Sequence, residues 1–339
     1  MLTNITMLII LLLFFFIFFW GVRKTNDSIT FFDKTSTNAL RGICCLVVMM
    51  VHIPGAHGNR IQDLVSSFGF IAVTIFFMMS GYGLTLSYEK SNIDLYAFWK
   101  KRYLKLILMN WLVNAFIILI DLVVGIYEIN FRRIVSINPW VLWLIICYFI
   151  FMLAHHVSAK YAKIIIGISI TIFSLLTYLT GISFTKTIWV YEIYGFLWGM
   201  LLAKYFNKIY CFLGENWVKK FLIIVVLTLL CGALYLKFKS VYFWGEYVLK
   251  IILGLMFVVL YLSLNAKYVI GNRVATFLGT ISFEVYLFHV YAFSLVDYLF
   301  PNVNSGIYIL IAMMLTVFMA YIIHICANFV QIKWKSHRR

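Results

Sequence analysis

The sequence predicts an all-α protein that crosses a membrane about eleven times. Of its 339 residues 64% are hydrophobic and only 12% are charged, and the mean hydropathy is +0.98, which is far outside the range of soluble proteins. The apolar residues also gather in runs close to the roughly 20 residues that a spanning helix needs. These runs cover approximately residues 4–22, 39–56, 66–87, 104–126, 139–156, 162–181, 187–205, 219–236, 246–265, 275–299 and 306–329.

The basic residues are distributed unevenly over the connections between these runs. The net charge is +16, and with eleven spans 21 of the 28 Lys and Arg residues fall on one side. An excess of Lys and Arg in short loops marks the cytoplasmic side. We therefore expect the N-terminus outside and the C-terminus, with a basic tail over residues 331–339, in the cytoplasm. The charge is then a topology signal, and we expect no nucleic-acid partner.

The first run is expected to be an additional helix within a segment of residues 1–27. It has no basic residue before its apolar stretch and no small-residue cleavage pattern, and Arg23 and Lys24 follow it directly. These features favour an uncleaved membrane helix over a signal peptide.

The second run carries two ionisable residues, Arg41 and His52. At about 100° and 1.5 Å per residue, eleven steps along a helix bring the two side chains to nearly the same face, about 16 Å apart along the axis. Pro54 and Gly55 are expected to end or bend the helix just beyond the histidine. An ionisable group deep in a membrane is costly and is therefore a candidate for function. The alternative is a polar group that is paired within the bundle.

Four further motifs follow this helix in the chain. They are GFIAVTIFFMMSGYGL at residues 69–84, KRYLKL at 101–106, WVLW at 140–143 and SFEVYLFH at 282–289. Together with Arg-x10-His opening a membrane helix, they resemble the acyltransferase 3 family, membrane-embedded O-acyltransferases of cell-surface glycans. The resemblance covers about residues 36–330. It implies a core of ten helices in the cell (plasma) membrane and acyl-CoA as the donor.

The donor side is predicted from the third and fourth runs. Lys101, Arg102 and Lys105 are either ordinary cytoplasmic flanking charges or, as a set, partners for the phosphates of acyl-CoA, acetyl-CoA in the simplest case. Ser80 and Gly81 are small, so they allow close approach of a neighbouring helix or of an acyl chain. No cysteine or histidine cluster has metal-binding spacing, and we expect no metal.

The acceptor side is predicted from polar residues near the outer ends of the runs. Glu192 is either a helix-end residue or a partner for a sugar hydroxyl, and His57 lies in an outer loop where it could contact substrate. Trp143, beside Trp140, fits an interfacial aromatic belt or an acceptor site. His289 lies deep in the tenth run, where it either lines a channel or holds the bundle together.

These residues together predict a membrane O-acyltransferase. Neutral His52 would accept the proton of a hydroxyl, and Arg41 would bind the donor. The predicted reaction moves an acyl group, acetyl in the simplest case, from cytoplasmic acyl-CoA to an extracytoplasmic or lipid-linked polysaccharide. The alternative is a transporter or flippase of a lipid-linked sugar, although no internal repeat of the kind common in transporters is evident. Besides membrane lipid, the expected partners are the acceptor and acyl-CoA. The acceptor, the acyl chain and the oligomeric state stay open.

Overall fold

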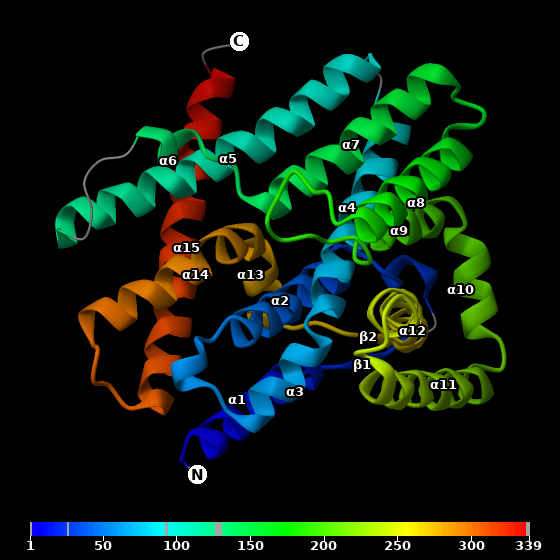
Figure 1. Cartoon of the computed structure of the whole chain (residues 1–339). Helices are drawn as coiled ribbons and strands as arrows, with labels where there is room; N and C mark the ends of the chain where they lie inside the picture. The colour runs from blue at the N-terminus through cyan, green and yellow to red at the C-terminus, as the bar shows by residue number, and fades with distance from the viewer. Residues whose placement is uncertain (1, 26, 92–93, 126–130, 337–339) are drawn as a thin grey trace.

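The computed structural model describes residues 2–25, 27–91, 94–125 and 131–336, and nearly all of its regular structure is helical (Figure 1). Its elements are α1 (Leu2–Phe19), β1 (Arg23–Lys24), η1 (Ser28–Thr30), α2 (Lys34–Val51), η2 (Gly55–His57), α3 (Arg60–Phe68), α4 (Phe70–Glu89), α5 (Leu95–Val124), α6 (Phe131–Val135), α7 (Pro139–Val157), α8 (Ala162–Thr180), α9 (Tyr194–Lys204), α10 (Phe206–Gly214), α11 (Trp217–Phe238), η3 (Trp244–Val248), α12 (Leu249–Asn265), β2 (Tyr268–Val269), α13 (Arg273–Thr280), α14 (Ser282–Leu299) and α15 (Ser305–Ser336). The all-helical prediction is confirmed. Part of the predicted basic tail, residues 337–339, lies outside the described residues.

The number of spanning helices differs from the prediction. Among the described residues, seven helices are long and apolar enough to cross a membrane, or eight if the bent pair α13 and α14 counts as one span. The predicted count of about eleven is therefore not confirmed. An integral membrane protein is nevertheless what these helices indicate.

Three of the predicted runs account for much of the difference. The run 187–205 contains only the 11 helical residues of α9, which are about 17 Å long and shorter than a hydrocarbon core of about 30 Å. The run 275–299 is broken after Thr280, where α13 and α14 meet at 75°. Helix α2 has 18 residues, but its first turn is polar and most of its residues are enclosed by other helices. Apolar sequence therefore continues through turns and enclosed helices that do not each span a bilayer.

Helix α4 lies inside the bundle and α11 lies at its edge (Figure 1). Within an 18-residue apolar stretch of the α3–α4 segment, 67% of the residues are buried. The corresponding value for α11 is 11%. Helix α11 exposes a run of large apolar side chains, among them Leu222, Ile223, Val226, Leu227 and Leu230. An exposed apolar surface of this extent is expected to face lipid.

Helices α4 and α9 are in backbone contact through glycines. A Cβ atom at Gly195 would lie 2.1 Å from the carbonyl oxygen of Thr74, and one at Gly199 would lie 1.9 Å from that of Met78. No side chain fits at such distances, so small residues set the spacing of the two helices.

A second glycine contact joins α2 to α13. A Cβ atom at Gly42 would lie 2.3 Å from the carbonyl oxygen of Ala275, and one at Gly279 would lie 1.8 Å from that of Asn38. Because α13 turns sharply away from α14, α2 contacts both helices (Figure 1).

The N-terminus of α2 is anchored to α12. The Asp33 carboxylate accepts from the Ser36 backbone N–H at 2.7 Å and caps the helix. Tyr261 donates its hydroxyl to the Ser36 carbonyl at 2.9 Å, and the Asn265 amide donates to the Ser36 hydroxyl at 3.2 Å. Nearby, β1 pairs antiparallel with β2, which the sequence did not predict.

Two hydrogen bonds join loops or helix ends that the charge pattern predicts to lie on the same side of the membrane. On the predicted inner side, the Thr25 backbone N–H donates to the Lys267 carbonyl at 2.8 Å. On the predicted outer side, Lys239 donates to the Ser67 hydroxyl at 3.2 Å.

The glycine contact between α4 and α9 should contribute to the thermal stability of the protein. We expect Gly199→Ala to lower the midpoint of thermal unfolding of the purified protein, because the added methyl group meets the backbone of α4 and overpacking of this kind costs about 1–3 kcal/mol. Gly232→Ala in lipid-facing α11 is the matched control, since its Cβ would meet nothing within 4 Å. Equal midpoints for both variants would contradict the contact.

Candidate active site

Helix α2 carries Arg41 and His52 toward two different cavities. The helix is continuous from Lys34 to Val51 and His52 is its C-cap, so the predicted spacing of about 16 Å holds. Arg41 lines a cavity of about 300 Å³, which we call the inner cavity, and His52 lines a pocket of about 200 Å³, which we call the outer pocket.

Three cationic side chains line the inner cavity. Arg41 from α2 meets Arg102 and Lys105 from α5, and Ser80 from α4 also lines the space. The Ser80 hydroxyl donates to the Phe76 carbonyl at 2.9 Å, and Arg41 Nε lies 3.2 Å from the Met79 sulfur. Arginine and lysine side chains at one cavity are suited to phosphate groups.

The lining of the inner cavity also contains a carboxylate and several aromatic rings. Glu284 is buried, and its Oε1 lies 2.8 Å from His324 Nδ1, so the two residues form a pair at the cavity. The aromatic lining residues are Phe76, Trp140, Tyr148, Phe283 and Tyr286. The Trp140 Nε1–H is buried and has no hydrogen-bond partner among the described residues, so it is a donor available to a bound molecule.

The outer pocket brings His52 together with Glu192 and Lys250. Glu192 is only 4% exposed, and its Oε2 has no hydrogen-bond partner among the described residues. Lys250 Nζ donates to the Tyr191 hydroxyl at 2.8 Å and lies 4.1 Å from the centre of that ring. A buried carboxylate oxygen without a partner costs free energy unless a ligand or water satisfies it.

His52 has a defined tautomer. Its Nδ1 lies 2.9 Å from the Val48 carbonyl oxygen. A carbonyl only accepts, so Nδ1 carries the proton of the neutral ring and Nε2 is left with its lone pair. His52 is therefore oriented to act as a base through Nε2.

A row of packed rings lies between the two cavities. The rings of His52 and His289 are 4.7 Å apart, and those of His289 and Tyr286 are 5.8 Å apart. His52 belongs to the outer pocket and Tyr286 to the inner cavity, while His289 is buried between them.

The other predicted donor residues lie outside the inner cavity. Lys101 is exposed on α5. Gly81 faces α9, where an added Cβ would lie 2.1 Å from the Phe196 carbonyl oxygen. Its small size therefore serves helix packing.

Trp143 is fully buried in the bundle rather than placed in an aromatic belt. Its Nε1–H donates to the Thr185 hydroxyl at 2.8 Å, and its ring packs against Phe173 and Phe184. It lines neither of the two cavities.

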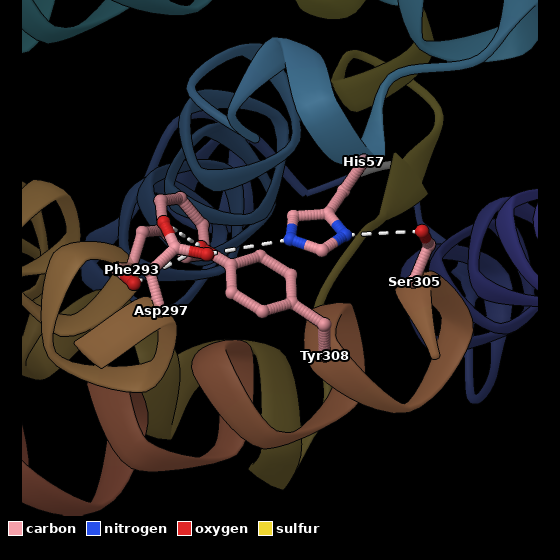
Figure 2. A network of polar contacts seen from close by, with 5 residues as sticks. All are labelled: His57, Phe293, Asp297, Ser305 and Tyr308. Carbon is pink, nitrogen blue, oxygen red and sulfur yellow. Dashed lines mark hydrogen bonds and ion pairs between the residues drawn. The ribbon is translucent and has the colours of Figure 1, made fainter. Parts of the chain in front are cut away.

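His57 lies in a polar network beside α14 and α15 (Figure 2). Its Nε2 is 3.3 Å from an Asp297 oxygen and its Nδ1 is 3.0 Å from the Ser305 hydroxyl. The ring stacks on Tyr308 at 3.7 Å, and the Tyr308 hydroxyl donates to Asp297 at 3.2 Å. His57 therefore joins the loop after α2 to α14 and α15, and it lines neither cavity.

Several residues of these cavities were not predicted as site residues from the sequence. Lys250 and Tyr148 lie in apolar runs, and a lysine inside such a run was a signal that could have been used. Glu284 and His324 are far apart in the chain, and only the packing of α14 against α15 brings them together.

One comparison with known proteins matches the part of the chain that carries these cavities. A family model described as an acyltransferase domain matches residues 34–325, from the first residue of α2 into α15. No curated protein and no solved structure matches the chain. The match covers most of the chain, and both the Arg41–His52 helix and the SFEVYLFH motif lie within it. The chain therefore belongs to the acyltransferase 3 family, and its apolar helices make it an integral membrane member of that family.

Proposed function

We propose that the protein is an O-acyltransferase that moves an acyl group, acetyl in the simplest case, from cytoplasmic acyl-CoA to a hydroxyl of an extracytoplasmic or lipid-linked polysaccharide. The observation that carries the proposal is the placement of Arg41 in a cationic cavity and His52 in a second pocket by one helix. Membership of an acyltransferase family supports this reaction over the flippase alternative.

The inner cavity supports binding of the donor. Arg41, Arg102 and Lys105 can donate charge-assisted hydrogen bonds to the phosphates of acyl-CoA. The long phosphopantetheine arm would run past the aromatic lining residues of the inner cavity toward Tyr286. This path would bring the thioester toward His289 and His52. Trp140 supplies an unused N–H to this path.

The outer pocket supports binding of the acceptor. The free Oε2 of Glu192 can accept a hydrogen bond from a sugar hydroxyl, and Tyr191 and Tyr235 provide rings and further hydroxyls. These groups would hold the acceptor beside His52.

The reaction balances with His52 as the single base and acid. His52 Nε2 takes the proton of the acceptor hydroxyl while the oxygen attacks the thioester carbonyl. The tetrahedral intermediate then expels the CoA thiolate, which receives that proton from His52, and an ester remains on the glycan. No acyl-enzyme is needed.

Removal of the base tests the assignment of His52. We expect His52→Ala to lower transfer of alkali-labile label from radioactive acetyl-CoA to membrane glycolipids by about 10²–10⁴-fold, the range for loss of a general base. His155→Ala is the control, because His155 lies at the end of α7 outside both cavities. Mass spectrometry of surface glycans with and without the gene identifies the acceptor. Transfer at the wild-type rate by His52→Ala would refute the proposal.

The donor site makes a separate prediction. We expect Arg102→Ala to raise the KM for acetyl-CoA about 10- to 100-fold, because a hydrogen bond to a charged group contributes about 1.5–3 kcal/mol. Lys100→Ala removes a neighbouring exposed charge outside the cavity and should leave the KM unchanged. Equal effects in the two variants would point to general surface charge instead of a phosphate site.

The proposed orientation, with the N-terminus outside the plasma membrane and the C-terminus in the cytoplasm, rests on the Lys and Arg distribution. Cys211 is exposed on α10, on the predicted cytoplasmic side. We expect a membrane-impermeant maleimide to label Cys211 in inverted vesicles but not in intact cells. The variant Cys211→Ser is the control that shows the label is on this cysteine. Labelling in intact cells would reverse the orientation.

A further inference from the structure

His289 has an unsatisfied acceptor in the middle of the bundle. The side chain is 2% exposed. Its Nδ1 lies 2.7 Å from the Tyr286 carbonyl oxygen and 3.2 Å from that of Val285. Both partners only accept, so Nδ1 carries the proton of the neutral ring and Nε2 holds a lone pair. That Nε2 is buried and has no hydrogen-bond partner among the described residues.

The ring of His52 lies next to that of His289. The two rings are 4.7 Å apart and inclined at 70°, whereas the neighbouring Phe293 ring is 6.3 Å away. A buried acceptor without a partner is unfavourable by about 1–3 kcal/mol, so a group of this kind in a folded protein calls for a physical explanation. Positive charge on the adjacent ring would provide it, because a lone pair stabilises a nearby cation strongly where water is excluded.

We propose that His289 is a positioning residue for His52, whose unpartnered nitrogen stabilises the imidazolium that forms when His52 takes the acceptor proton. This inference rests on the proposed function. His289 stays neutral throughout: the proton moves from the hydroxyl to His52 and then to the thiolate. The two rings also pack edge to face, which restricts rotation of the His52 ring.

The other ionisable groups near His52 line the outer pocket, to which His289 does not belong. Glu192, Lys250, Tyr191 and Tyr235 line the outer pocket with His52, while His289 contacts it from α14. Substitution of His289 therefore changes the environment of His52 without removing a group from the outer pocket. Loss of the lone pair makes protonated His52 less favourable, so the acid limb of the rate profile, where His52 becomes protonated, moves to lower pH.

The test uses the purified full-length protein in detergent, so that both cavities meet the same pH. The probe is radioactive acetyl-CoA with total membrane glycolipids, and the readouts are kcat, the KM for acetyl-CoA and the pH profile. We expect His289→Phe, which keeps the ring but has no acceptor, to lower kcat about 10- to 100-fold. This is less than the 10²–10³-fold lost with a donor that touches the reacting atoms. The KM should stay within about twofold and the acid limb should move to lower pH, because only charge on His52 is affected.

Two comparisons separate this role from a structural one. His289→Gln retains an acceptor oxygen and should recover part of kcat and return the acid limb toward its wild-type position. His155→Phe removes a histidine that is also bonded to a carbonyl through Nδ1, at 2.9 Å, and should leave the limb unchanged. An unchanged profile in His289→Phe, or equal losses in the Phe and Gln variants, would overturn the inference while leaving the proposed function intact. Absence of transfer by the wild-type protein would overturn both.

Discussion

The backbone contact between α2 and α13 positions α2 so that Arg41 lines the inner cavity and His52 lines the outer pocket. Gly42 and Gly279 leave no room for a Cβ atom on either side, so the two helices touch along their main chains. The 75° bend after Thr280 then directs α14 across α2. As a result Glu284, near the start of α14, lines the cavity of Arg41, and His289, farther along, contacts His52. Ionisable groups inside an apolar bundle are tolerated when they are paired or line a cavity, and the α2–α14 crossing provides this for both ends of α2.

The bundle divides into an inner set of tightly packed helices and an outer set that faces lipid. The inner helices α2, α4, α9 and α13 are joined by glycine contacts that allow little variation in spacing. The outer helix α11 exposes large apolar side chains. Arg41, Ser80 and His52 lie on or directly after the closely packed helices α2 and α4, which give these side chains rigid supports. The conformational entropy of ordering these groups is paid for during folding rather than during each reaction.

The sequence was sufficient to predict an all-helical membrane protein, the helix that joins Arg41 to His52, and the end of that helix before Pro54. It could not show which face of an apolar helix meets which neighbour, because α4 is apolar on all sides and its periodicity carries no direction. Gly81 and Trp143 were thus predicted at sites that the structure places within helix packing. Lys250, Tyr148 and the pairing of Glu284 with His324 depend on tertiary contacts. The bend after Thr280 occurs without a proline, although Gly279 lies directly before Thr280.

The network around His57 bears on how the protein moves. The loop that follows His52 is held to α14 and α15 by two polar contacts and a stacked ring (Figure 2). The opposite end of α2 is held to α12 through Ser36. Contacts at both ends of α2 favour a fixed helix over the rocking halves of an alternating-access carrier. Under the proposed function, the donor and the acceptor would therefore have to reach His52 through their own flexibility, because both ends of α2 are held by neighbouring helices.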